Sequence, residues 1–491
     1  MAFLRDLAAK VRVLFERRLV RAGLYALLLL VLLVTSLRIV RPSDGAGSFV
    51  RSRSDFEDYY RAALMTGRGE DPYRVDQLQR IMELPRTLKP QDLLDPAKLQ
   101  DILLMFSGVG TYLYLPLTAF LLQPLTLLEY QSAALIFQLL SLCAFAACAY
   151  LLFRFRREEE RVFSAAFLPA GWILAGLLAE NAANGNIATF LLLLTSAGLA
   201  LAMRQKWVPG FLGGFLLGIA VILKITPAFL LLVPLAFLRL PALFGAGTGI
   251  AAGLALPAAL FGVSRTIELT QGWVRLILET YSKYVFFRPW ANNQTLSGAV
   301  GKWFLPGSDL KQGDAGLPFL SGIPDEGTYL LLANTVRAGN ALLWILALVC
   351  ALWIAWQVFR RNFQGMIRSV LSGKMEASGS GMYSARFAHL VFLCTLVSLV
   401  TAGVSWYHAY SVLLLPLYLR MCAVQNGEHL RAGEKIIAWV IGCFSLLPPL
   451  LSSHTRDVVA LYSFFTVAVV GMILYSAFLL LSGRAGKQNG I

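Results

Sequence analysis

Five short polar clusters interrupt an otherwise apolar chain, and their residue types can do acid-base chemistry and bind anions. A carboxylate can accept a proton, an ammonium or imidazole group can bind a phosphate, and amides can bond to hydroxyl groups. The clusters are Asp55–Tyr60, Asn184–Asn186, Lys224–Pro227, Asn292–Thr295 and Ser405–His408. If basic loops are placed in the cytoplasm, every cluster emerges on the opposite face of the membrane. The clusters therefore predict an active site assembled from loops at one membrane surface.

The first cluster predicts a general base. Ser54-x-x-Glu57 fits a capping box, so a helix should start there and Asp55 should lie in its first turn. The positive end of the helix dipole favours an ionised carboxylate at this position. The alternatives are that Asp55 is simply a solvated residue of the first turn, or that Asp58, one turn along the same face, is the base.

Lys224 predicts an anion-binding position. It ends an apolar run on the outer side, against the general bias that places lysine in the cytoplasm. An ammonium at this depth can hold a lipid phosphate, and Arg288 adds positive charge on the same side. The alternative is that the Lys224 side chain only extends to the membrane interface.

The last two clusters supply neutral donors and one imidazole. Asn292 and Gln294 can bond to sugar hydroxyls or phosphate oxygens, although asparagine-rich loops are also common turns. His408, which follows Tyr407 just inside a span, can donate to a phosphate. The alternative for His408 is a hydrogen bond to a neighbouring helix.

Asp58 and four further polar residues are candidates for the acceptor side of the site or for supporting roles. Asn184 and Asn186 are expected to begin a helix, which they could merely cap. Tyr59 and Tyr60 follow the carboxylates and could equally be ordinary aromatic residues of the membrane interface.

Composition sets the class of protein. The chain has 491 residues, 57% of them hydrophobic and only 14% charged, and its mean hydropathy is +0.65. This is too little polar surface for a soluble globule of this size. The apolar runs do not alternate in polarity, so the fold class is all-α polytopic. The net charge of +15 is spread beside the hydrophobic segments, which favours positive-inside orientation over nucleic-acid binding.

The charge pattern predicts the topology. Residues 1–21 should form a basic, amphipathic cytoplasmic segment that is not cleaved, followed by one membrane domain over 22–482 and a cytoplasmic tail over 483–491. The basic loops give about twelve spans with both termini inside. The 113–128 stretch, broken by two prolines, is expected to stay on the outer side; if it crosses, the count becomes thirteen and the register changes.

Two long outer loops, 41–112 and 263–330, are expected to carry juxtamembrane helices and aromatic residues. The six cysteines have neither metal-ligand spacing nor a convincing disulfide pattern. Motifs for nucleotide or zinc binding are absent. No metal and no cofactor is therefore expected.

The order of the motifs between about residues 50 and 420 resembles glycosyltransferase family 87. The motifs are the Asp-apolar-x-x-Tyr-Tyr start at Asp55, Asp71-Pro72-Tyr73, Tyr112-x-Tyr114-x-Pro116, Gly185-Asn186, Leu223-Lys224-x-Thr226-Pro227, Asn293-Gln294-Thr295-Leu296-x-Gly298 and Ser405-Trp406-x-His408.

The resemblance implies a GT-C fold and an inverting, metal-independent transferase that acts at the periplasmic or exterior face of the cell membrane. The donor would be a polyprenyl-phosphate sugar, with mannose as the sugar, and the acceptor a hydroxyl of a lipid or glycan. By motif position Asp55 would be the base, with Lys224 and His408 stabilising the leaving phosphate. Further donor-side positions would be Asn292, Gln294, Arg288 and Tyr407.

Two other functions stay open. A transferase of the same fold could use polyprenyl-phosphate arabinose or glucose. A lipid or solute transporter is the rival from another class, although transporters tend to place binding residues near the bilayer midplane and to have matching halves.

Overall fold

The computed structural model describes residues 18–40, 54–79, 112–154, 164–281, 287, 293–305, 326–372, 385–425, 428–450 and 463–484. These residues form helices and one isolated antiparallel bridge, between Asn293 and Trp406. The prediction of an all-α membrane protein is confirmed. The predicted amphipathic segment at the N-terminus lies largely outside the described residues.

The first part of the described chain forms one long helix, a short helix that carries Asp55, and a series of apolar helices. They are α2 (Arg18–Ser36), η1 (Leu37–Val40), α3 (Asp55–Gly67), α6 (Pro116–Leu122), η3 (Gln123–Leu127), α7 (Tyr130–Arg154), α8 (Ser164–Ile173), α9 (Ala175–Asn184), α10 (Ala188–Ala202) and α11 (Trp207–Leu223). Pro116 occupies the first position of α6, where the missing N–H costs nothing.

The second part continues with further apolar helices and two short helices that carry polar residues. They are η5 (Thr226–Leu231), α12 (Leu232–Ala236), α13 (Leu240–Phe261), α14 (Val263–Val274), η6 (Arg275–Tyr281), α16 (Leu296–Phe304), α18 (Glu326–Ser372), α19 (Ala385–Val400), η7 (Tyr407–Leu413), α20 (Leu414–Gln425), α21 (Ala432–Leu450) and α23 (Phe464–Leu481).

Within the described ranges, five helices are long and apolar enough to cross a membrane. They cover Ala22–Val40, Tyr130–Leu152, Leu240–Phe261, Gly327–Gln364 and Phe464–Leu481. Several shorter apolar helices accompany them, including Pro116–Leu127 in the stretch expected to stay outside. The predicted count of about twelve spans stays a prediction.

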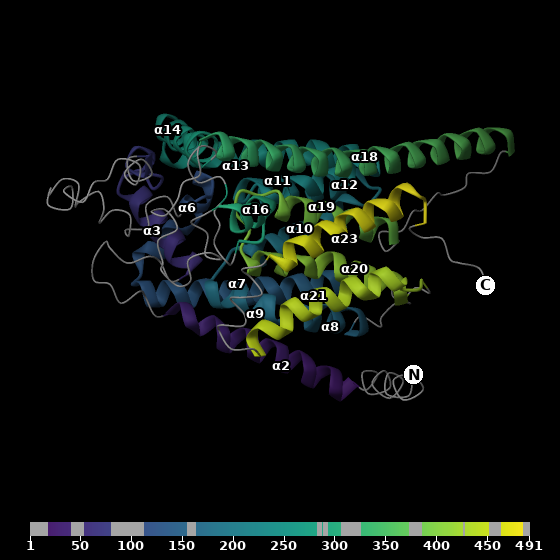
Figure 1. Ribbon diagram of the computed structural model, residues 1–491, viewed down its shortest axis with the longest axis horizontal. Helices are drawn as coiled ribbons and strands as arrows, with labels where there is room; N and C mark the ends of the chain where they lie inside the picture. Colours follow the sequence, from purple (N-terminus) through teal and green to yellow (C-terminus); the bar gives the residue numbers. More distant parts are fainter. Residues whose placement is uncertain are drawn as a thin grey trace.

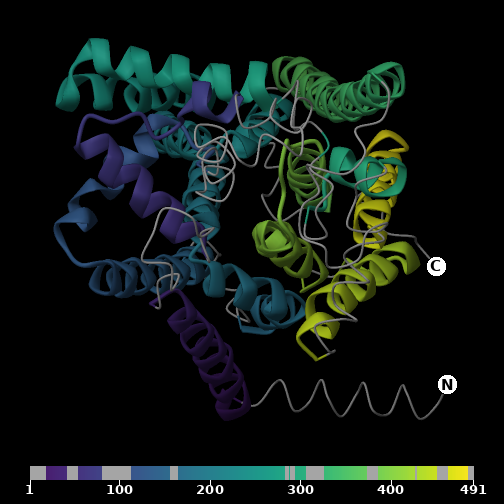
Figure 2. The same cartoon turned by 60° about the vertical axis from the view of Figure 1, so that its left-hand side comes forward.

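The helices lie roughly parallel to the long axis of the molecule, and α3 and α6 gather at one end of it (Figure 1). Helix α2 begins and α23 finishes toward the other end (Figure 1). Helix α18 runs along one side of the bundle, and the turned view separates it from α2 on the opposite side (Figure 2). Helix α19 is the centre of the largest core, since nearly all of its side chains are buried.

A second, smaller core lies beneath the polar site. It joins aromatic and aliphatic side chains of α3, α6, α7 and α14, among them Phe56, Phe137 and Leu269, with Tyr73 from the segment that follows α3. Burial of such side chains supplies the main favourable free energy for docking α3 on the bundle. The position of Asp55 at the start of α3 is therefore fixed by apolar packing of the same helix.

Glycines allow α11 and α13 to approach closely. A Cβ atom added at Gly214 would lie 1.8 Å from the carbonyl oxygen of Ala242, and one added at Gly245 would lie 1.9 Å from that of Phe211. Any larger residue at these positions forces the two backbones apart. This packing fixes the axis of α11, and Lys224 is the residue that directly follows it.

Candidate active site

Asp55 is the first residue of α3, as the capping box predicted. The hydroxyl of Ser54 accepts a hydrogen bond from the backbone N–H of Glu57 at 3.1 Å, which is the N-cap interaction. Glu57 does not stay in the solvent: it is buried and pairs with Arg61, one turn along the helix. The cap thus determines where the helix begins and leaves the Asp55 carboxylate at its positive end.

Asn186 meets Asp55 from the turn between α9 and α10. Its Nδ2 donates to Asp55 Oδ2 at 2.6 Å, and its Oδ1 accepts from the backbone N–H of Ala188 at 2.8 Å. The expectation that Asn184 and Asn186 both begin a helix is half wrong. Asn186 precedes Ile187, the N-cap of α10, and its side chain accepts from the Ala188 N–H in the first turn. Asn184 is instead the last residue of α9, where its side chain bonds back to Glu180.

Gly185 makes this close approach feasible. Its φ of 59° is left-handed, a conformation that glycine adopts without steric cost. A Cβ atom here would lie 2.8 Å from the Cβ of Phe56 and 2.9 Å from Ile39 Cδ1. The turn can therefore sit directly against α3, which brings Asn186 to the carboxylate.

His408 completes the contact set from a segment more than 350 residues away in the chain. Its Nε2 lies 3.0 Å from Asp55 Oδ2 and 3.3 Å from Asn186 Nδ2, and the imidazole is almost fully buried. The ring N–H therefore donates to the carboxylate. Both donors use Oδ2, so among the described residues Asp55 Oδ1 forms no hydrogen bond. About 20% of the Asp55 side chain remains exposed, and Oδ1 is free to take a proton.

Opposing effects set the ionisation of Asp55. Burial raises the pKa of the carboxyl group, but the hydrogen bonds from His408 and Asn186 and the positive charge of Lys224 lower it. The lowering effects are the stronger, and the pKa lies below the ordinary value of 3.8. Asp55 is therefore a carboxylate at neutral pH.

Lys224 is the candidate residue for binding an anion. It is half-buried, directly after α11, and its Nζ lies 5.5 Å from the centre of the Tyr114 ring. Burial lowers the pKa of the ammonium, while the negative charge of Asp55 opposes this change. Within the described residues the ammonium forms no hydrogen bond and no ion pair. It is a desolvated cation that an incoming anion would stabilise.

Two tyrosines form the floor next to Asp55. The Tyr59 and Tyr114 hydroxyl groups lie 2.7 Å apart, and their rings meet edge to face. Burial and the neighbouring negative charge of Asp55 raise the pKa of both phenols. Tyr59 is 1% exposed, so it is a core residue of the site and not an aromatic of the membrane interface.

The amide cluster is not arranged as an open binding surface. Asn293 and Gln294 are 0% exposed, and the hydroxyl of Thr466 donates to Gln294 Oε1 at 3.2 Å. Their backbone pairs with the segment that leads to His408, since the Gln294 N–H donates to the Ser405 carbonyl at 2.9 Å. Two other predicted site residues, Arg288 and Asn292, lie outside the described residues.

The remaining predicted residues lie around this centre. Tyr60 donates to the Leu128 carbonyl at 2.9 Å on the exposed side of α3, and Asp58 is half-buried on the same helix. Tyr407 packs edge to face on Phe465 at 5.5 Å, and its buried hydroxyl has no hydrogen-bond partner in the part of the chain that the structure describes. The hydrogen bonds of Asn186 and His408 go to Asp55 and not to its rival Asp58.

Two residues near the site, Tyr114 and Lys302, have no role that the sequence predicted. Tyr114 belongs to the Tyr112-x-Tyr114-x-Pro116 motif, and its hydroxyl and ring link Tyr59 to Lys224. Lys302, in the apolar stretch Leu296–Phe304, is 0% exposed. A charged residue inside an apolar run was the signal that could have found Lys302.

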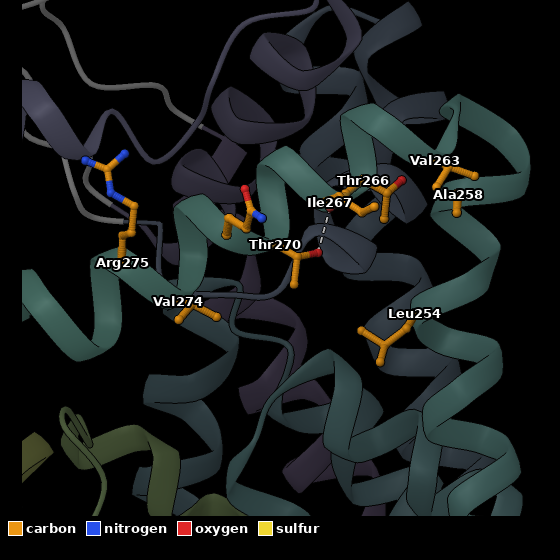
Figure 3. A pocket seen from close by; sticks show the side chains of 9 residues that line it. Leu254, Ala258, Val263, Thr266, Ile267, Thr270, Val274 and Arg275 are labelled. Carbon is orange, nitrogen blue, oxygen red and sulfur yellow. Dashed lines mark hydrogen bonds between the residues drawn. The ribbon is translucent and has the colours of Figure 1, made fainter.

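An apolar groove lies beside the site, between α13 and α14. It has a volume of about 580 Å³. Figure 3 shows Leu254 of α13 and Val274 of α14 directed into this space, whereas Arg275 points away from it. On the other side of α14, Trp273 donates to the Leu113 carbonyl at 3.0 Å, next to Tyr114. One helix therefore separates the groove from the floor of the polar site.

Among the residues that the structure describes, no group of three or more His, Cys, Asp or Glu side chains could hold a metal ion. The charged centre of the site is made of one carboxylate, one imidazole and one ammonium. This set can remove a proton on one side and stabilise an anion beside it.

Comparison with known proteins gives one match. The model of glycosyltransferase family 87 matches residues 112–375, which is more than half of the chain. Asn186, Lys224 and Gln294 lie inside the matched region, whereas Asp55 and His408 lie before and after it. No curated protein and no solved structure matches the chain.

Proposed function

The chain belongs to glycosyltransferase family 87 and is a membrane glycosyltransferase, and we propose that it moves one sugar from a polyprenyl-phosphate donor to a hydroxyl group of a lipid or glycan acceptor. The observation that carries this proposal is the arrangement at Asp55. Among the described residues, one carboxylate oxygen is held by His408 and Asn186, the other forms no hydrogen bond, and the nearby Lys224 ammonium forms neither a hydrogen bond nor an ion pair.

In the proposed reaction Asp55 Oδ1 takes the proton of the acceptor hydroxyl. The acceptor oxygen then forms a bond to the anomeric carbon of the donor sugar, from the face opposite the phosphate. The bond between that carbon and the phosphate oxygen breaks, and its electron pair stays on the polyprenyl phosphate. A single displacement of this kind inverts the anomeric centre. General-base assistance contributes roughly two to four orders of magnitude to such a rate.

Lys224 is proposed to bind the donor phosphate. The charge of the leaving group grows as the glycosidic bond breaks, and a cation already positioned there needs no reorganisation. The apolar groove between α13 and α14 supports a lipid donor, because its walls suit an isoprenoid tail. Mannose is the proposed sugar, and the site is proposed to face the exterior or periplasm of the inner membrane, as the positive-inside pattern predicts.

The test is an assay of the purified protein with radiolabelled polyprenyl-phosphate mannose, glucose or arabinose and a lipid extract as the source of acceptors. Wild-type protein should transfer one of these sugars, and Asp55→Asn should lower kcat by roughly 100-fold or more. Asp76→Asn is the matched control, because Asp76 is an exposed residue that pairs with Arg275; it should keep wild-type activity.

Unchanged transfer by Asp55→Asn would move the base to another carboxylate, and Asp58→Asn then tests the rival directly. If no lipid-linked sugar is turned over, but the protein takes up substrate in proteoliposomes, the transporter is the better function.

A further inference from the structure

We propose that Lys302 is a positioning residue for this reaction: through a buried brace it fixes His408 against Asp55. The brace consists of Asn293, Gln294, Ser405 and Trp406, which pair two segments far apart in the chain. The inference rests on the proposed function, because it concerns the base of that reaction.

The Lys302 side chain is buried. It lies in α16 and is 0% exposed, although an ammonium is costly to remove from water. Among its contacts, Nζ donates to the carbonyl oxygen of Asn293 at 2.9 Å. If this donor is removed, the buried Asn293 carbonyl oxygen loses a hydrogen bond, which costs free energy. The segment around Asn293 should then shift to give this oxygen a new donor.

Asn293 pairs with the segment that precedes His408. The side-chain Oδ1 of Asn293 accepts from the Ser405 N–H at 3.2 Å. Next to it, the Gln294 N–H donates to the Ser405 carbonyl at 2.9 Å. Asn293 and Trp406 form the isolated antiparallel bridge. Lys302 and Ser405 therefore bind different atoms of the same residue.

Hydrogen bonds connect the brace to the helix that carries the His408 imidazole. Helix η7 starts at Tyr407, and the Ala409 N–H donates to the Trp406 carbonyl at 2.9 Å, so the brace residue Trp406 also forms the first turn. From within η7, the Tyr410 hydroxyl donates to the Gln294 carbonyl at 2.9 Å. His408 lies between these two fixed points, and the brace determines where its ring meets Asp55 Oδ2.

The fit of α16 on the brace is tight. A Cβ atom at Gly298 would lie 2.7 Å from Asn293 Nδ2, and Thr295 caps α16 through its hydroxyl, which accepts from the Gly298 N–H at 3.0 Å. Interiors packed this closely pass a displacement on to their neighbours. A small shift of Asn293 should therefore reach His408.

The experiment is a double-mutant cycle on full-length protein in detergent, with initial rates of sugar transfer. Lys302→Met keeps the length and volume of the side chain and removes the donor. It should lower kcat roughly 10- to 100-fold, as expected for a small misplacement of a reacting group, and change the KM for the donor less than about twofold. Lys206→Met is the matched control, because Lys206 is exposed at the start of α11; it should leave kcat unchanged.

The decisive comparison is in the His408→Ala background. If Lys302 acts through His408, adding Lys302→Met to His408→Ala should cost less than about twofold, because the group it positions is gone. A full loss in both backgrounds would overturn the inference, since a residue that only maintains folding reduces the active fraction equally in each. Wild-type activity in Lys302→Met would overturn it as well.

If the Lys302→Met protein does not fold, Tyr410→Phe tests the same brace through a different hydrogen bond. It removes one hydroxyl and the bond to the Gln294 carbonyl, and it should show the same loss of kcat and the same non-additivity with His408→Ala. Additive losses for Tyr410→Phe would count against the brace. These outcomes differ from failure of the proposed function, in which the wild-type protein itself transfers no sugar.

Discussion

Asn186 connects the backbone of α10 to the carboxylate of Asp55. Its Oδ1 accepts from the Ala188 N–H at 2.8 Å, and its Nδ2 donates to Asp55 Oδ2 at 2.6 Å. The first bond fixes which end of the amide faces Asp55. The result is a neutral donor that favours the carboxylate form without adding a charge.

Changing this donor into an acid should make activity depend on pH. In the Asn186→Asp variant two carboxyl groups face each other, and they cannot both ionise easily. The apparent pKa of the pair should rise, so transfer at pH 6 should fall roughly 10- to 100-fold and recover partly at higher pH. The measurement is kcat/KM against pH.

The wild-type protein is the reference for this profile. The pKa of Asp55 is lowered below 3.8, so the carboxylate persists throughout the neutral range. A group with a lowered pKa stabilises the fold above its unfolded pKa, and this contribution is lost as pH falls through the folded value. Because the Asp55 carboxylate remains ionised, wild-type activity that depends on it should not change with pH above about pH 5. An identical profile for Asn186→Asp would contradict the assignment of Asp55 as the base.

Lys224 should affect the donor more than the acceptor. Lys224→Met removes the ammonium next to Tyr114 but keeps a similar chain length. We expect the KM for the polyprenyl-phosphate donor to rise roughly 10-fold or more, because a charged hydrogen bond to phosphate is worth about 1.5–3 kcal/mol. The KM for the acceptor should change less than twofold.

The measurement is initial rates with each substrate varied in turn. Lys206→Met serves again as the control for loss of one exposed lysine. Equal increases of both KM values would remove Lys224 from the phosphate site.

Gly185 should be the most sensitive glycine of the site. Gly185→Ala places a Cβ atom 2.8 Å from that of Phe56, in a backbone conformation with φ of 59°. Strain of this kind costs about 1–3 kcal/mol, and the turn that carries Asn186 should move away from α3. We expect a lower midpoint of thermal unfolding in detergent together with reduced transfer.

Gly247→Ala is the matched control for this change. Gly247 lies in α13 and a Cβ atom there meets nothing within 4 Å, so stability should stay the same or rise slightly. Equal destabilisation by both substitutions would show that the fit at Gly185 is not special.

The class of fold and the start of helix α3 follow from local sequence alone. Apolar runs in a chain with 14% charged residues require membrane helices, and local hydrogen bonding at Ser54 determines where α3 begins. The uninterrupted apolar run over residues 131–153 forms α7 (Tyr130–Arg154). The end of an apolar run at Lys224 is likewise the end of α11. Each of these features depends on residues within a few turns of one another.

Which polar residues meet depends on how distant segments of the chain pack together. Asp55 and His408 are 353 positions apart. Local sequence patterns do not predict that the residue in contact with Asp55 is a histidine instead of a second acidic residue. The roles of Asn186 and of buried residues such as Gln294 and Lys302 depend on how the helices pack. The physical reason is that periodicity and capping act over one or two helical turns, whereas the site is set by packing between segments hundreds of residues apart.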